Sequence, residues 1–159
     1  MHITLKEHWQ FHAWRVSEIV AFIATLDENV LTEKNEGTFG SVDGLVRHLF
    51  FAEWVWHRRL QGDSGPFRVD ENISLLELGV HWIKMTELWA KEVDAAHERK
   101  MIYRNLNGEP YSNTVSEVMM HLVDHATYHT GQMMTTLRMK GVKPLHTGYI
   151  HYRRIVGNL

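Results

Sequence analysis

Residues 114–140 carry a helical pattern in which polar side chains interrupt an apolar stripe. Positions spaced alternately three and four apart lie on one helix face, and such a face normally packs into a core. This face comprises Val115, Val118, Leu122, His125, His129, Gln132, Thr136 and Met139. An imidazole in a core costs free energy unless it has a partner. His125 and His129, four residues apart, therefore indicate either a metal site or hydrogen bonds to neighbouring helices.

Two earlier segments show the same period, each with one histidine on its apolar stripe. The first helix is predicted over residues 4–26, where the histidine is His12. The rest of its stripe is Leu5, Trp9, Val16, Ile19, Ile23 and Leu26. The second helix is predicted from about residue 42 to residue 60, with Ser41 as its N-cap and His48 on its stripe. Leu45, Ala52 and Val55 complete that stripe.

The remaining segments predict a third helix, two loops and a hairpin. The third helix runs roughly over residues 74–98, and no histidine lies on its stripe. Residues 27–40 and 61–72 lack a clear period and contain turn-forming residues, so they are predicted to be loops. In residues 100–112, Asn107-Gly108 suits a type I′ turn, which predicts a short hairpin or an extended loop.

Four amphipathic helices imply an all-α four-helix bundle. We expect a single domain spanning residues 1–159, because no internal repeat or low-complexity segment divides the chain. Gly141 is expected to end the last helix. The tail that follows is aromatic and basic, and we expect it to pack over one end of the bundle.

The composition excludes several classes of protein. The 159 residues include no cysteine, which rules out disulfides, thiolate metal ligands and a cysteine nucleophile. The net charge of −2 argues against binding to nucleic acid or to a membrane surface. No apolar run approaches the roughly 18–20 residues of a membrane span. No signal peptide is visible, and we expect a cytoplasmic protein.

Helical phase marks three of the 12 histidines as candidate metal ligands. If the second and last helices face each other, His48, His125 and His129 can converge on one divalent ion. Three protein ligands leave a coordination position open, which is typical of a catalytic site, where a water or a thiolate can bind. The H-E-x-x-H motif of metalloproteases is absent, because Asp124 precedes His125.

Other polar side chains on these stripes have two interpretations each. Gln132 lies one turn beyond His129, so it can orient an imidazole or a bound water, or simply bond another helix. His12 can face the metal site or be a core histidine with its own partners. His121 lies one turn before His125, toward the edge of the stripe, and is interpreted as a neighbouring or surface residue.

Several segments together resemble the DinB/YfiT-like family of metal-dependent proteins. SVDGLVRHLFFAEWVWHRRLQG resembles the second helix of that family, and HLVDHATYHTGQMMTTLRMKG resembles its fourth-helix motif, H-x-x-x-H-x-x-x-H-R-G-Q. FHAW resembles its first-helix motif, and YRNLNGEPYSNTVSEVMMH resembles the segment that leads into the last helix. The resemblance covers nearly the whole chain. Thr130 and Gly148 depart from it, because the family usually has Arg and Asp at these two positions.

The resemblance implies a four-helix bundle that holds one divalent metal ion, commonly zinc or nickel. Carried over by motif, its ligands are His48, His125 and His129, whereas His121 matches a motif histidine that is not a ligand. Members are often homodimers, and relatives include thiol-dependent S-transferases and a mycothiol-dependent isomerase. The implied function is a metalloenzyme that activates a low-molecular-weight thiol or a water toward a small-molecule substrate. A non-catalytic metal-binding or stress-related bundle is the alternative, and a metal-free interaction domain is a third.

Overall fold

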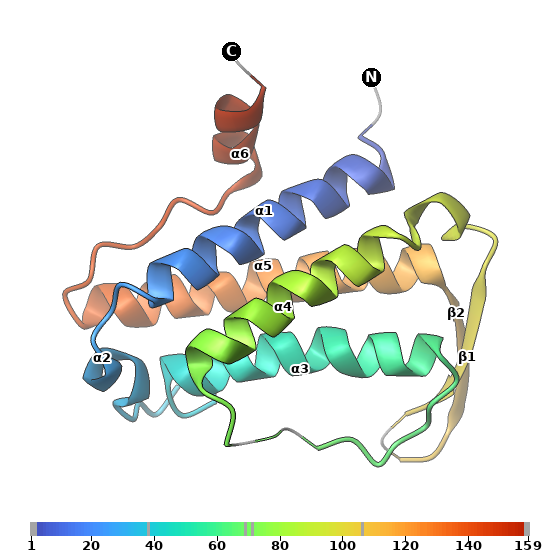
Figure 1. The fold of residues 1–159 in the computed structure, drawn as a ribbon, viewed down its shortest axis with the longest axis horizontal. Helices are drawn as coiled ribbons and strands as arrows, with labels where there is room; N and C mark the ends of the chain where they lie inside the picture. Colours follow the sequence, from blue (N-terminus) through green and yellow to red (C-terminus); the bar gives the residue numbers. More distant parts are fainter. Residues whose placement is uncertain (1–2, 38, 69, 71, 106, 158–159) are drawn as a thin grey trace.

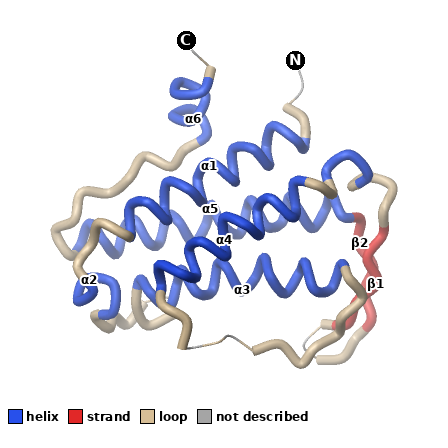
Figure 2. Tube along the Cα trace, viewed as in Figure 1, coloured by secondary structure: helices blue, strands red, loops and turns tan. Residues whose placement is uncertain are grey.

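Four long helices form a bundle in the computed structural model of the chain (Figure 1). The described residues are 3–37, 39–68, 70, 72–105 and 107–157. The bundle helices are α1 (Leu5–Ile23), α3 (Val42–Leu60), α4 (Leu75–Ala90) and α5 (Val115–Met139). Two strands lie together at one end of the bundle (Figure 2). The all-α fold class is thus confirmed.

Side-chain caps explain where the bundle helices begin. The Thr4 hydroxyl accepts the backbone N–H of Glu7, and the Glu7 carboxylate accepts the backbone N–H of Thr4. Thr114 and Glu117 form the same reciprocal capping box at the start of α5. Ser41 caps α3 as predicted, and Ser74 caps α4. Each cap satisfies a backbone N–H that has no partner inside the helix.

Each bundle helix packs against two others. α1 contacts α4 and α5, and α3 contacts the same two helices, so α1 and α3 lie diagonally opposite. α3 and α4 run in the same direction, because the connection over residues 61–74 returns along the length of the bundle (Figure 1). α1 and α4 approach closely at Gly79, where an added Cβ would lie 2.8 Å from the Val20 side chain. This arrangement places the face of α3 that carries His48 beside α5.

Two segments differ from the sequence prediction. Residues 27–40 contain a short helix, α2 (Glu28–Thr32), which buries Leu31 against the core. Its five residues are too few to show a helical period. α4 ends at Ala90, not at Glu98, and a 3-10 turn (Val93–Ala95) follows. The chain turns there because the carbonyl of Ala96 accepts the backbone N–H of Ser116, which ties this segment to the start of α5.

The hairpin expected over residues 100–112 is present, with a longer connection than predicted. β1 (Lys100–Arg104) pairs antiparallel with β2 (Pro110–Thr114), and Arg104 lies opposite Pro110. Five residues of sequence thus separate Arg104 from Pro110, which is longer than a two-residue type I′ turn. The Asn105 side chain accepts the backbone N–H groups of Asn107 and Glu109 and so organises this connection.

The C-terminal tail ends in a short helix, α6 (Tyr149–Val156). Gly141 follows α5 with a φ of +79°, as expected for a residue that ends a helix. α6 packs against the side of α1, not over one end of the bundle: Tyr152 stacks near Phe11 and Trp14. None of the described helices has both the length and the apolar character needed to cross a membrane.

Candidate metal centre

The buried face of α5 differs from the stripe that the sequence predicted. It is formed by Val115, Val118, Met119, Leu122, Val123, Ala126, His129, Thr130, Met133, Met134 and Leu137, with Ser116. His125 and Gln132 are half-buried at its edge, and Met139 is 84% exposed. A spacing that averages 3.5 residues drifts by about 20° per heptad around a straight helix, so the predicted stripe leaves the core toward its end. His125 and Gln132 therefore lie at the border of the core, while His129 is buried.

On α3, the buried face likewise passes beside the predicted histidine. Val42, Leu45, Val46, Leu49 and Glu53 are buried, whereas Ala52 and Val55 are only half-buried. His48 is half-buried at the border of this face. Two half-buried edges, one from α3 and one from α5, thus meet where the two helices pack together.

The three histidines come together at this border. One ring nitrogen of each of His48, His125 and His129 lies within 4.8 Å of those of the other two. The Nε2 atoms of His48 and His125 are 3.0 Å apart. Three Zn–N bonds of about 2.0–2.1 Å at tetrahedral angles place the nitrogens roughly 3.4 Å apart, near the 3.0 Å between His48 and His125 and inside the 4.8 Å limit of the cluster. The three imidazoles could therefore hold one metal ion, and none of the described Asp or Glu side chains belongs to the cluster.

Burial keeps two of these imidazoles neutral. Loss of water around His48 and the proximity of His129 lower the pKa of His48 to about 4. Loss of water also lowers the pKa of His125 to about 4, with smaller effects from His129, His48 and His121. A neutral imidazole has a free nitrogen lone pair, which is the form that coordinates a metal. At neutral pH these two side chains are thus ready to act as ligands.

Gln132 fixes the orientation of one ring. Its Oε1 lies 2.6 Å from Nδ1 of His129. An amide oxygen can only accept a hydrogen bond, so Nδ1 of His129 carries the proton and Nε2 keeps its lone pair. This contact matches one of the two interpretations of Gln132, the one in which it orients an imidazole.

Phe39 covers the cluster from the loop before α3. Its ring stacks on His48 with the centroids 3.8 Å apart, and it meets His129 edge to face at 5.4 Å. Phe39 has a φ of +58°, which costs free energy in a residue with a bulky side chain. An added Cβ at Gly44 would lie 2.2 Å from the Phe39 carbonyl oxygen, so glycine at position 44 permits this conformation. Sequence reasoning missed Phe39, because no local pattern marks it.

His12 lies in a separate buried network. Nε2 of His12 donates to Oε1 of Glu53 at 2.7 Å, and Arg15 donates to Nδ1 of His12 at 2.9 Å. Trp82 also donates to Oε1 of Glu53, at 2.8 Å. His12 is therefore a core histidine with its own partners and does not belong to the cluster of three. Glu53 was also missed, although a charged residue in line with Val42, Val46 and Leu49 was a signal.

The two positions that depart from the family pattern, Thr130 and Gly148, lie in α5 and at the start of α6. Thr130 is buried, and its hydroxyl has no hydrogen-bond partner among the described residues. Gly148 is the N-cap of α6 and has no side chain to form a cap. Thr130 and Gly148 cannot form an ion pair, and α6 is held beside α1 by aromatic packing. His121 is exposed and lies beside the cluster, its ring centroid 5.8 Å from that of His125.

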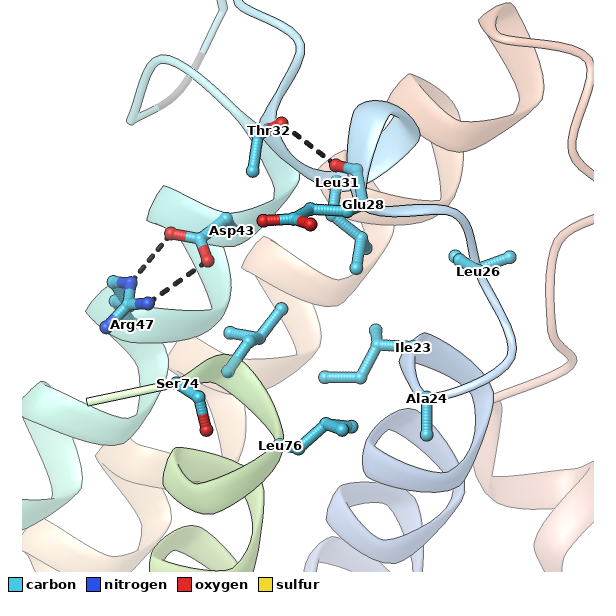
Figure 3. Close-up of a pocket in the computed structure, with 11 residues that line it drawn as sticks. Ile23, Ala24, Leu26, Glu28, Leu31, Thr32, Asp43, Arg47, Ser74 and Leu76 are labelled. Carbon is cyan, nitrogen blue, oxygen red and sulfur yellow. Dashed lines mark hydrogen bonds and ion pairs between the residues drawn. The ribbon is translucent and has the colours of Figure 1, made fainter. Parts of the chain in front are cut away.

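A cavity of about 730 Å³ lies where α2 and the start of α3 meet the end of α1 and the start of α4 (Figure 3). Aliphatic side chains form much of its lining, among them Ile23, Leu31 and Leu76. Three charged residues also line it: Asp43 and Arg47 are paired at 2.7 Å, and Glu28 is the third. None of the three clustered histidines lines this cavity, so it is separate from the candidate metal centre.

Comparison with known proteins identifies the family. The model of the DinB family matches residues 1–156. Protein DinB of Bacillus subtilis (strain 168) is 20% identical to this chain over 153 residues, a match that covers 89% of this chain and 88% of that protein. Together with the helical fold and the cluster of three histidines, the match over nearly the whole length shows that the chain belongs to the DinB family.

Proposed function

We propose that this protein is a metal-dependent enzyme in which His48, His125 and His129 hold one divalent ion, zinc or nickel. The observation that carries the proposal is the convergence of three ring nitrogens within 4.8 Å, with no carboxylate from the described residues beside them. Imidazole nitrogens suit both metals. Three ligands leave room for a further molecule on the ion, which is the arrangement of catalytic sites.

The chain's own residues prepare this site in three ways. Burial keeps His48 and His125 neutral, so protons compete with a metal only in acid. Gln132 holds the proton of His129 on Nδ1 and directs Nε2 into the cluster. Phe39 stacks on His48 and excludes water from that side of its ring. When bound, the ion supplies Lewis acidity, which lowers the pKa of a coordinated thiol or water.

The substrate is a small molecule, and the reaction is either transfer to a low-molecular-weight thiol or hydrolysis. The family resemblance favours the thiol reaction. It also motivates our expectation of a homodimer, whereas the absence of cysteine motivates that of a cytoplasmic location. A closed site that only stabilises the bundle requires a fourth protein ligand, and His12, one candidate, already bonds Glu53 and Arg15. This engagement of His12 favours the catalytic version.

Activity assays on protein loaded with zinc or with nickel test this proposal. The protein is incubated with bacterial low-molecular-weight thiols and an electrophile such as 1-chloro-2,4-dinitrobenzene, and separately with nitrophenyl esters and anilides. We expect turnover in one of the two assays that disappears in His125→Ala and on chelation. His81→Ala, at an exposed position on α4, is the control and retains turnover. Metal-loaded protein that turns over neither set supports the non-catalytic bundle instead.

A further inference from the structure

Arg59, near the end of α3, is a half-buried cation that has no polar partner among the residues the structure describes. Among the described residues, none accepts a hydrogen bond from its guanidinium, and its Nε atom is fully buried. No described carboxylate forms an ion pair with it. Its neighbour Arg58 is different, because it is exposed and paired with Asp63 at 2.5 Å. Within the described part of the chain, the guanidinium of Arg59 thus has a positive charge and unused hydrogen-bond donors.

Aromatic rings hold this guanidinium in place. Its central carbon lies 4.7 Å from the ring centroid of Trp56 and 5.1 Å from that of Tyr103, on β1. Arg59 also lines a pocket of about 450 Å³ between α3, the hairpin and the loop that follows α3. The other lining residues are mostly apolar or aromatic: Phe51, Ala52, Val55, Trp56, Phe67, Tyr103, Asn105 and Tyr111. An apolar pocket with one polar anchor is the usual form of a small-molecule site.

This pocket lies along the same helix face as the metal centre. Arg59 is eleven residues beyond His48, which is close to three full helical turns, or about 16 Å along the axis. A chain of ring contacts connects the two places. His121 lies 5.8 Å from His125 and 5.8 Å from Trp56, and Trp56 in turn touches Arg59. The two places thus lie on one face of α3 and are linked by packed side chains.

We propose that Arg59 and its aromatic pocket form a carboxylate-binding site for a molecule with an apolar or aromatic body. Arginine presents a planar fork of donors that matches the two oxygens of a carboxylate. Arg59 is the only cation that lines the described pocket. A monoanion balances its charge, whereas a phosphate dianion would bring a second, uncompensated charge into an apolar site. The link to chemistry at the histidines rests on the proposed function, but carboxylate binding does not.

Binding of 2-naphthoate tests the site, with neutral 2-naphthamide as the matched probe. Calorimetric titration of metal-free protein is expected to show at least tenfold tighter binding of the carboxylate. Arg59→Gln abolishes that preference, and Arg59→Lys retains part of it because the charge remains. Arg58→Gln is the control for loss of one positive charge, and it retains the full preference. Inorganic phosphate is expected not to compete with 2-naphthoate.

Two further measurements place the ligand. The indole N–H resonance of Trp56, assigned by Trp56→Phe, should shift on addition of 2-naphthoate to the wild-type protein, a readout that needs no Arg59 variant. His48→Ala should leave the carboxylate preference unchanged, so metal binding and carboxylate binding can fail separately. Loss of the preference in His48→Ala would mean that the carboxylate binds at the histidines. That result, or full preference in folded Arg59→Gln, overturns the proposal.

Discussion

At the scale of single residues, the bond between His129 and Gln132 determines which nitrogen of His129 is free. Gln132→Leu removes the acceptor for Nδ1–H, so the ring can rotate or change tautomer. Loss of such a partner typically lowers metal affinity by about 10–100-fold. We expect this decrease in a competition titration with a chromophoric chelator. Gln10→Leu, at an exposed position on α1, is the control and should retain the wild-type affinity. Equal affinities in both variants would show that the contact has no role.

The lowered pKa values of His48 and His125 predict how stability depends on pH in the metal-free protein. At about pH 7.5 both histidines are largely neutral in the folded and in the unfolded chain, so they cause little dependence there. As the pH falls from there through 6.5 toward 4, the unfolded chain binds protons that the folded chain excludes. The free energy of unfolding therefore decreases over this range.

Urea unfolding at pH 7.5, 6.5 and 5.5 measures this effect, because most carboxylates titrate at lower pH. The double variant His48→Gln and His125→Gln should lose less stability between pH 6.5 and 5.5 than the wild type. His57 and His8 also have a lowered pKa and remain in both proteins, so some dependence persists. An unchanged slope in the double variant would contradict the burial of these imidazoles.

At the scale of elements, two helix glycines should respond oppositely to alanine. Gly44→Ala places a Cβ 2.2 Å from the Phe39 carbonyl oxygen, so the loop that covers His48 must move. Such overpacking costs about 1–3 kcal/mol, and we expect metal affinity to decrease as well. At Gly131 on α5 nothing lies within 4 Å of an added Cβ, and Gly131→Ala should stabilise the protein by about 0.5–1 kcal/mol. Urea unfolding of both variants checks the signs, and destabilisation of equal size would refute this difference.

The boundaries of elements were predictable where a cap marks them. Ser41 and Thr114 bond backbone groups within a few residues of themselves, so their effect is visible in local sequence. The end of α4 was not predictable, because Ala96 is held by a backbone bond to Ser116, twenty residues further along the chain. Local reasoning also cannot show how far an edge residue such as His125 lies from the core. That distance depends on which helices pack on either side.

At the scale of the whole molecule, one buried network joins all four bundle helices, because Arg15 of α1 also donates to Thr127 of α5. Glu53 of α3 accepts from His12 of α1 and from Trp82 of α4. Glu53→Leu removes the acceptor. It also removes the negative charge that balances the guanidinium of buried Arg15, which bonds His12 in the same network. Breaking a buried pair from one side costs about 3–5 kcal/mol. We expect this loss in the free energy of unfolding, whereas Glu87→Leu, an exposed substitution on α4, should change it little. A small loss at Glu53 would mean that water replaces the carboxylate.

Some of the candidate functional residues were predictable from the sequence, and others were not. His48, His125 and His129 share helical phase with apolar residues and match a family motif, so their proximity was expected. Phe39 lies outside the segments that resemble the family, and Arg59, in the neighbouring pocket, lies inside one of them without matching a known functional position. The loop before α3 places Phe39 against His48. The hairpin brings Tyr103 against Arg59. Both roles arise from contacts between segments far apart in the sequence or in an irregular loop, which a local pattern does not encode.

The metal content of the purified protein tests the central claim most directly. Inductively coupled plasma mass spectrometry on protein expressed in metal-replete medium should give about one zinc or nickel ion per chain. His48→Ala, His125→Ala and His129→Ala should each reduce this value to near zero, while the exposed His81→Ala leaves it unchanged. Circular dichroism confirms that each variant remains helical. Wild-type protein without metal, or full metal content in all three folded cluster variants, would contradict the assignment of His48, His125 and His129 as a metal centre.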